Sequence, residues 1–138
     1  MLTKLAELHK ICFPNRPWGA EEFASLKKSG AEILAGDNGF IVWRCAADEC
    51  EIITIGVHPD ARRTGIADAI LIIAEGEMKK SGAARVFLEV AENNAAAKSL
   101  YEKHEYRQIA TRPKYYDNID LSAGDLAKVD AAVMEKVL

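Results

Sequence analysis

Apolar positions in the first sixty residues predict two helices followed by three strands. Apolar side chains recur at steps of three and four residues near the N-terminus, which predicts a helix that must end near Pro14: Leu2, Leu5, Leu8 and Cys12. Phe23 and Leu26 predict a second, shorter helix. Three runs of β-forming residues follow with turn segments between them, and they predict an antiparallel meander over residues 31–35, 40–46 and 51–57.

The most regular helical pattern covers residues 66–80. Its apolar residues share one face, its charged residues lie largely off that face, and Gly82 is a stop signal. The remaining pattern predicts a strand over 85–90, a helix over 95–104, and strands over 106–111 and 131–137. This order predicts an α+β, or mixed α/β, domain in which about four helices flank a largely antiparallel central sheet of about six or seven strands.

Length and composition predict a single globular domain over residues 1–138. No Pro/Gly/Ser-rich segment is long enough to act as a linker within the 138 residues. Hydrophobic residues make up 49% of the chain and charged residues 28%, which is a composition that can bury one core and excludes disorder.

Charge and hydropathy argue against two classes of partner. The 21 acidic residues outnumber the 18 basic ones, so the chain lacks the overall positive field that holds nucleic acid. Its longest apolar stretch, Ala69–Ala74, is far shorter than the roughly 20 residues of a membrane-spanning helix. The first residues also lack the features of a secretory signal. We therefore expect a cytoplasmic protein that binds neither nucleic acid nor membrane.

The cysteines and histidines predict neither a disulfide nor a metal site. Cys12, Cys45 and Cys50 are odd in number and lack C-x-x-C spacing, so we expect reduced, partly buried thiols. His58 and His104 have no partners at ligand spacing, and we expect no metal.

The segment Arg62–Ala67 lies between the third predicted strand and the long helix, where it suits an anion. Main-chain N–H groups at a helix start carry the positive end of the helix dipole, and Gly65 lets a ligand approach them. Arg62 and Arg63 add charge-assisted hydrogen bonds. Solvated surface charge is the alternative interpretation, and the segment is neither a G-x-G-x-x-G fingerprint nor a P-loop.

Several motifs resemble a known family. The pattern R-x-x-G-x-A between a strand and a long helix resembles the coenzyme A pyrophosphate loop of the GNAT acetyltransferases. Leu88-Glu89-Val90, the run from Asn93 to Ala97, and Ser99-Leu100-Tyr101-Glu102 are similar to the RimI-type members, which acetylate protein N-terminal amines. The resemblance implies a GNAT-like fold, acetyl-coenzyme A as co-substrate, and these cofactor-binding residues: Ile55, Gly56, Val57, Arg62, Arg63, Thr64, Gly65, Ile66, Ala67 and Asn94.

The resemblance also implies roles for a carboxylate and a phenol. Glu89 would take a proton from the substrate ammonium, directly or through water, and Tyr101 would give one to the departing thiolate. A phenol has an unperturbed pKa of about 10, so it is protonated at neutral pH. Each residue has a structural alternative: Glu89 as a carboxylate on a half-exposed strand, Tyr101 as a core aromatic, and Asn94 as a helix N-cap.

The implied acceptor is a protein or peptide N-terminus, that of a ribosomal protein, with Pro17-Trp18 and Tyr115-Tyr116 in the acceptor-side segments. Transfer to a small amine or amino acid is one alternative, because loops set the substrate in this superfamily. A non-catalytic coenzyme A binding module is the other. The sequence departs from the family in two places: it has His104-Glu105-Tyr106 where Leu-Gly-Phe is usual, and no counterpart of the opening strand.

Overall fold

The structure, a computed structural model, describes residues 2–117 and 128–138, and it describes side chains for residues 2–113 and 129–138. The chain divides into two compact units. The first unit runs to Ala84 and includes Leu138, and the second unit is Arg85–Val137. The single domain expected over residues 1–138 stays a prediction.

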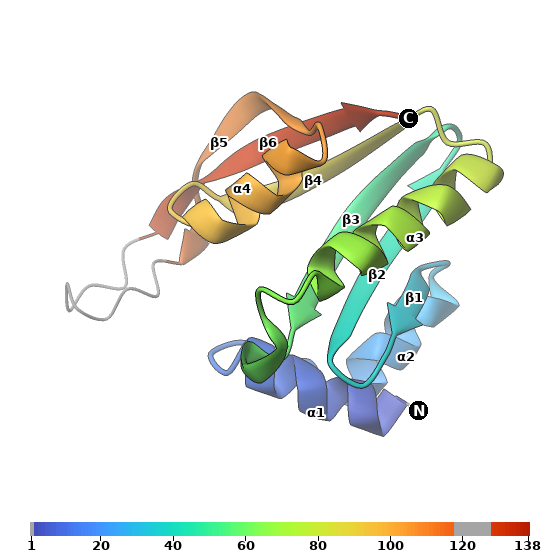
Figure 1. Cartoon of the computed structure of the whole chain (residues 1–138), viewed down its shortest axis with the longest axis vertical. Coiled ribbons are helices and arrows are strands. Elements are labelled where there is room, and N and C mark those ends of the chain that lie inside the picture. Colours follow the sequence, from blue (N-terminus) through green and yellow to red (C-terminus); the bar gives the residue numbers. More distant parts are fainter. Residues whose placement is uncertain (1, 118–127) are drawn as a thin grey trace. The chain divides into compact units, whose positions relative to one another are not determined.

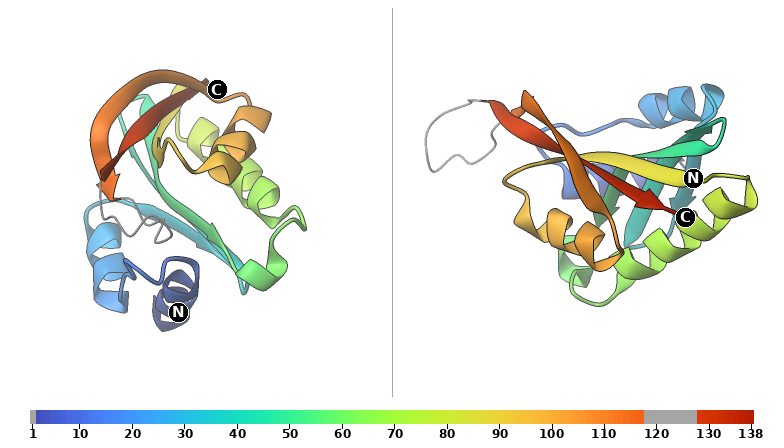
Figure 2. Two further views of the ribbon diagram at one scale, coloured as in Figure 1. Left: turned by 90° about the vertical axis from the view of Figure 1, so that its left-hand side faces the viewer. Right: turned by 90° about the horizontal axis from the view of Figure 1, so that it is seen from above.

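The first unit contains a three-stranded sheet between helices (Figures 1 and 2). Its strands pair in the antiparallel order β1-β2-β3, which confirms the predicted meander. Helices α1 and α2 lie on one face of this sheet and α3 lies on the other, as Figure 2 shows. The bounds are α1 Leu2–Cys12, α2 Ala20–Lys28, β1 Glu32–Ala35, β2 Gly39–Ala46, β3 Glu49–Val57 and α3 Ile66–Lys80, with a short 3-10 turn at Pro59–Ala61.

The core of the first unit forms where α1 and α2 meet β2. The fully buried rings of Phe23 and Phe40 are its largest members. The other buried residues of this cluster are small or aliphatic: Leu5, Leu8, Ala31 and Val42. The apolar spacing that predicted the first two helices is therefore the spacing that fills this core. Among the described residues, no helix is long and apolar enough to cross a membrane.

A buried histidine fixes the connection between α1 and α2. The main-chain N–H of Trp18 donates to Nδ1 of His9 at 3.0 Å, and the two rings stack with centroids 4.8 Å apart. Burial lowers the pKa of His9, and the nearby Glu22 carboxylate opposes that shift. The neutral ring keeps Nδ1 available as an acceptor at neutral pH.

The prediction of three reduced cysteines is wrong for two of them. Cys45 and Cys50 form a disulfide, whereas Cys12 is a free, half-buried thiol. The physical reason is strand register, because a two-residue turn after Ala46 sets Ala46 opposite Glu49 and Cys45 opposite Cys50. The C-x-x-C rule misses such a pair, since directly opposite positions on a hairpin are close regardless of their spacing along the chain.

The second unit is a three-stranded antiparallel sheet with one helix. Its elements are β4 Arg85–Ala91, α4 Ala95–Lys103, β5 Arg107–Asp117 and β6 Lys128–Val137. The last strand of the chain, β6, lies in the middle and pairs with both β4 and β5. The predicted strand 106–111 is too short, because β5 continues through Pro113 as an outer strand with a register shift between Arg112 and Tyr116.

Helix α4 ends in a turn that normally uses glycine. The N–H of Tyr106 donates to the carbonyl of Tyr101 and the N–H of Glu105 donates to that of Glu102, both at 3.0 Å. This is a Schellman turn, and Glu105 takes its left-handed position with φ of 72°. The chain thus keeps the turn even though glutamate replaces the glycine that is usual in the resembling family.

Glu105→Gly should raise the free energy of unfolding by about 1 kcal/mol, because glycine has no Cβ to strain a left-handed residue. Urea titration followed by circular dichroism measures this change. Glu105→Ala is the matched control, since it removes the charge and keeps a Cβ. An equal gain from alanine would mean that the charge, and not the backbone, is responsible.

Candidate active site

The predicted anion site lies at the start of α3. Gly65 is the residue before the helix, and its φ of 85° turns the chain from the preceding loop into α3. The first helical hydrogen bond runs from the N–H of Ala69 to the carbonyl of Gly65 at 3.0 Å. The main-chain N–H groups of Ile66 and Ala67 therefore point out of the helix start, where the helix dipole is positive. One acidic residue, Asp68, also lies in this first turn.

The two arginines of this loop differ in role. Arg62 donates from Nε to the carbonyl of Val57 at 3.1 Å, so its side chain ties the loop to the end of β3. Arg63 is exposed and has a left-handed φ of 63°. The hydroxyl of Thr64 donates to the carbonyl of Ala61 and closes the turn between them. The predicted cofactor residues of the first unit are thus brought together by hydrogen bonds within the loop.

Residue 56, near the end of β3, is a glycine because its neighbours leave no space for a side chain. A Cβ added at Gly56 would lie 2.6 Å from the Phe40 ring and 3.3 Å from Cβ of Cys12. Sequence reasoning did not connect Cys12 with this segment. Burial raises the pKa of the Cys12 thiol, and Arg62 acts against that shift through its charge and a hydrogen bond. Cys12 therefore lies beside the predicted cofactor loop, which no spacing rule could reveal.

In the second unit, strand register separates the two predicted catalytic side chains. Glu89 pairs with Val133, and its neighbours Leu88 and Val90 pair with Met134 and Ala132 on the other face. Helix α4 covers the face of Leu88 and Met134. Glu89 is therefore on the face away from α4, at the middle of β4.

Tyr101 lies on the α4 side of the same sheet. Its side chain is 5% exposed, and its ring packs against Tyr106 with centroids 5.6 Å apart. Asn94 is the N-cap of α4, where its Oδ1 accepts from the N–H of Ala97 at 3.1 Å. The structural interpretations of Tyr101 and Asn94 thus hold, and the catalytic role of Tyr101 and the cofactor contact of Asn94 stay predictions.

An ion pair joins Glu89 to a residue that sequence reasoning did not select. The Nη1 atom of Arg112 on β5 lies 3.3 Å from Oε2 of Glu89 on β4. The side chains of Glu89 and Arg112 are 26% and 53% exposed. The sequence contained one signal, a basic stretch from Arg107 to Lys114, but only the strand order reveals which of its cations reaches Glu89.

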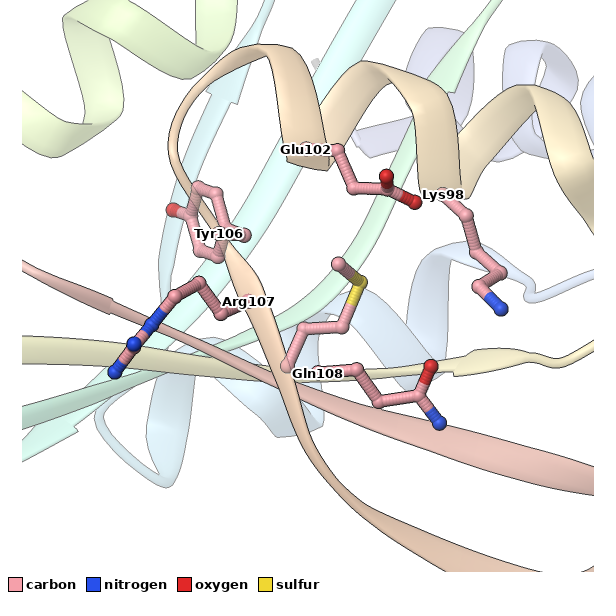
Figure 3. Close-up of a pocket in the computed structure, with 6 residues that line it drawn as sticks. Lys98, Glu102, Tyr106, Arg107 and Gln108 are labelled. Atoms are coloured by element: carbon pink, nitrogen blue, oxygen red, sulfur yellow. The ribbon is translucent and has the colours of Figure 1, made fainter.

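A separate hollow lies between α4 and the start of β5 (Figure 3). Its volume is about 450 Å³, and its lining residues are Lys98, Glu102, Tyr106, Arg107, Gln108 and Met134. Beside it, Glu92 accepts from Lys98 at 3.2 Å and from Gln108 at 2.8 Å. None of the predicted catalytic or cofactor-binding residues lines this hollow.

The sequence profile described as the Acetyltransferase (GNAT) family matches residues 4–106. The chain belongs to the GNAT acetyltransferases. This confirms the family, the enzyme class and the mixed α/β fold expected from the sequence. The matched range includes Glu89, Tyr101 and every predicted cofactor residue, and it ends before β5 begins.

The chain is similar to the following proteins and solved structures. The ribosomal protein bS18-alanine N-acetyltransferase of Escherichia coli K12 is 34% identical over 111 residues, which are 75% of this chain and 74% of that protein. The crystal structure of the ribosomal-protein-S18-alanine N-acetyltransferase from Escherichia coli has a TM-score of 0.84 at 28% identity, covering 99% of this chain and 86% of that one. A Bacillus subtilis acetyltransferase in complex with CoA has the same fold, with a TM-score of 0.75 at 21% identity over 98% of this chain and 91% of that one.

Of the two predicted acceptor-side segments, the structure describes the side chains of only the first. Trp18 is half-buried and packs against the core of the first unit. The side chains of Tyr115 and Tyr116 lie outside the part that the structure describes. Within the described residues, no group of three His, Cys, Asp or Glu side chains is placed to hold a metal ion.

Gly65→Val should weaken coenzyme A binding at least tenfold, because a β-branched residue is strained at φ of 85° and would reorient the N–H groups at the α3 start. Isothermal calorimetry with coenzyme A measures the affinity.

Gly76→Val is the matched control, since Gly76 lies within α3 and a Cβ there also meets open space. It should leave the affinity within about twofold of wild type. Equal affinities for the two variants, with circular dichroism unchanged, would remove the loop from the cofactor site.

Proposed function

We propose that this GNAT chain transfers the acetyl group of acetyl-coenzyme A to the N-terminal amine of a protein, with Glu89 as general base and Tyr101 as general acid. The observation that carries the proposal is the match to the GNAT acetyltransferase family over residues 4–106, a range that includes both side chains. The similarity to bS18-alanine N-acetyltransferases supports the choice of acceptor.

The first unit supplies the elements expected to hold the cofactor. The main-chain N–H groups from Arg62 to Ala67 would donate hydrogen bonds to the pyrophosphate, and Arg63 would add charge from the loop surface. Ile55, Gly56 and Val57 would line the pantetheine arm in the manner of an added strand.

The second unit supplies the expected chemistry. The acceptor arrives as an ammonium ion, and Glu89 removes its proton, directly or through water. The neutral nitrogen attacks the thioester carbon, the C–S bond breaks, and the sulfur leaves as a thiolate. Tyr101, a buried residue of α4, gives this thiolate a proton. Asn94 would contact the cofactor while it caps α4.

Direct transfer needs no covalent acetyl-enzyme. Cys45 and Cys50 are joined to each other and are not nucleophiles in that state. Cys12 is half-buried, and burial raises the pKa of its thiol, which lowers the fraction of reactive thiolate. The attack by the amine itself is therefore the simpler route.

Glu89→Gln and Tyr101→Phe should each lower kcat by about 100- to 10,000-fold and leave acetyl-coenzyme A affinity near normal, because each removes one proton-transfer group. Steady-state kinetics at saturating acceptor measures this fall. Two matched controls make the same chemical changes nearby: Glu135→Gln on the Glu89 face and Tyr106→Phe beside Tyr101. Near-normal turnover by both primary variants would mean that other residues carry the chemistry.

Synthetic peptides that begin with alanine should be acetylated at least tenfold faster, as kcat/KM, than spermidine or free alanine. Mass spectrometry of each product identifies the acetylated amine. A preference for spermidine or free alanine would replace the protein acceptor with a small amine. Tight coenzyme A binding without acetylation of any of these amines would favour a non-catalytic module.

A further inference from the structure

The ion pair between Glu89 and Arg112 spans a strand that contains neither residue. Glu89 is on β4 and Arg112 is on β5, and β6 lies between them. Two strand spacings amount to about 10 Å, so only a long side chain can bridge them. The distance of 3.3 Å between Nη1 of Arg112 and Oε2 of Glu89 means that the arginine extends across β6.

The sequence of β6 leaves room for this crossing. Arg112 pairs with Ala131, which in turn pairs with Ala91 of β4. Paired residues share a face, so Arg112, Ala131 and Glu89 all lie on the face away from α4. Ala131 is fully buried, and its methyl group is small enough for a guanidinium side chain to pass over.

The exposure of this ion pair favours a role in orienting the Glu89 carboxylate over a role in stabilising the fold. Ion pairs that are this exposed contribute little to folding, because water screens them. An arginine still fixes a carboxylate in direction, because its planar donors match the carboxylate oxygens. A general base must be held within hydrogen-bond reach of the proton that it takes, and a small misplacement of the base lowers the reaction rate strongly.

We infer that Arg112 is a positioning residue that orients the Glu89 carboxylate for proton removal from the acceptor amine. This inference rests on the proposed role of Glu89. It adds a residue from β5, which lies outside the range that the GNAT family profile matches.

Arg112→Gln should lower kcat by about tenfold and change the KM for acetyl-coenzyme A by less than about twofold, because the carboxylate remains but loses its orientation. The assay uses acetyl-coenzyme A and a short synthetic peptide with the N-terminal sequence of ribosomal protein bS18. Arg112→Lys keeps the charge without the planar donors, and it should recover part of the loss.

Arg85→Gln is the matched control. Arg85 forms an ion pair of 3.2 Å with Glu135 on the same face of the same sheet, and its side chain is similarly exposed, at 46%. Its loss should leave kcat within about twofold. A fall equal to that of Arg112→Gln would mean that general charge on this face matters, and it would overturn the inference.

A double-mutant cycle separates this inference from the proposed function. In a Glu89→Gln background, Arg112→Gln should cause no further fall in kcat, because the base that it orients is gone. An equal fall in both backgrounds would show that Arg112 acts independently of Glu89. If Glu89→Gln lowers kcat and Arg112→Gln does not, the positioning role is wrong and the proposed base stands. If Glu89→Gln keeps full activity, the proposed base is wrong and the inference is overturned with it.

Discussion

The pairing of β6 with both β4 and β5 is the constraint on which the second unit depends. It brings the last ten or so residues of the chain between two strands that are more than ten residues apart in sequence. Its register decides which residues of β4 face α4 and which face away. A slip of one residue between β4 and β6 would pair Glu89 with Ala132 or Met134 in place of Val133, and it would turn the carboxylate to the face that α4 covers. Everything proposed for Glu89 follows from this register.

In the first unit, the corresponding constraint is the close packing of side chains against Gly56. The Phe40 ring fills the space over Gly56, and α1 reaches the same point through Cys12. Arg62 then fastens the loop to the end of β3 through the carbonyl of Val57. The start of α3 is thereby held against the strand that precedes it. A loop with this many internal contacts presents its main-chain N–H groups already ordered, so an anion that binds there need not organise them.

Local patterns in the sequence predicted most of the helices and strands. The features that these patterns missed depend on strand pairing and other tertiary contacts. The helix 66–80 and the meander were correct, since amphipathic spacing and turn residues are local signals. The strand through Pro113 was cut short, because proline normally ends a strand, and only an outer strand tolerates it. The disulfide between Cys45 and Cys50, the contact of Cys12 with Arg62 and the bridge from Arg112 to Glu89 all join residues through tertiary structure. The candidate site residues came from family resemblance, and their roles stay predictions.

The separation of Glu89 and Tyr101 by the thickness of a sheet limits how the enzyme can be blocked. A compact inhibitor seated on one face can reach only one of these two side chains. Selectivity against other family members would come most readily from the Glu89 face, where Arg112 and Ala131 lie beyond the range of the family profile.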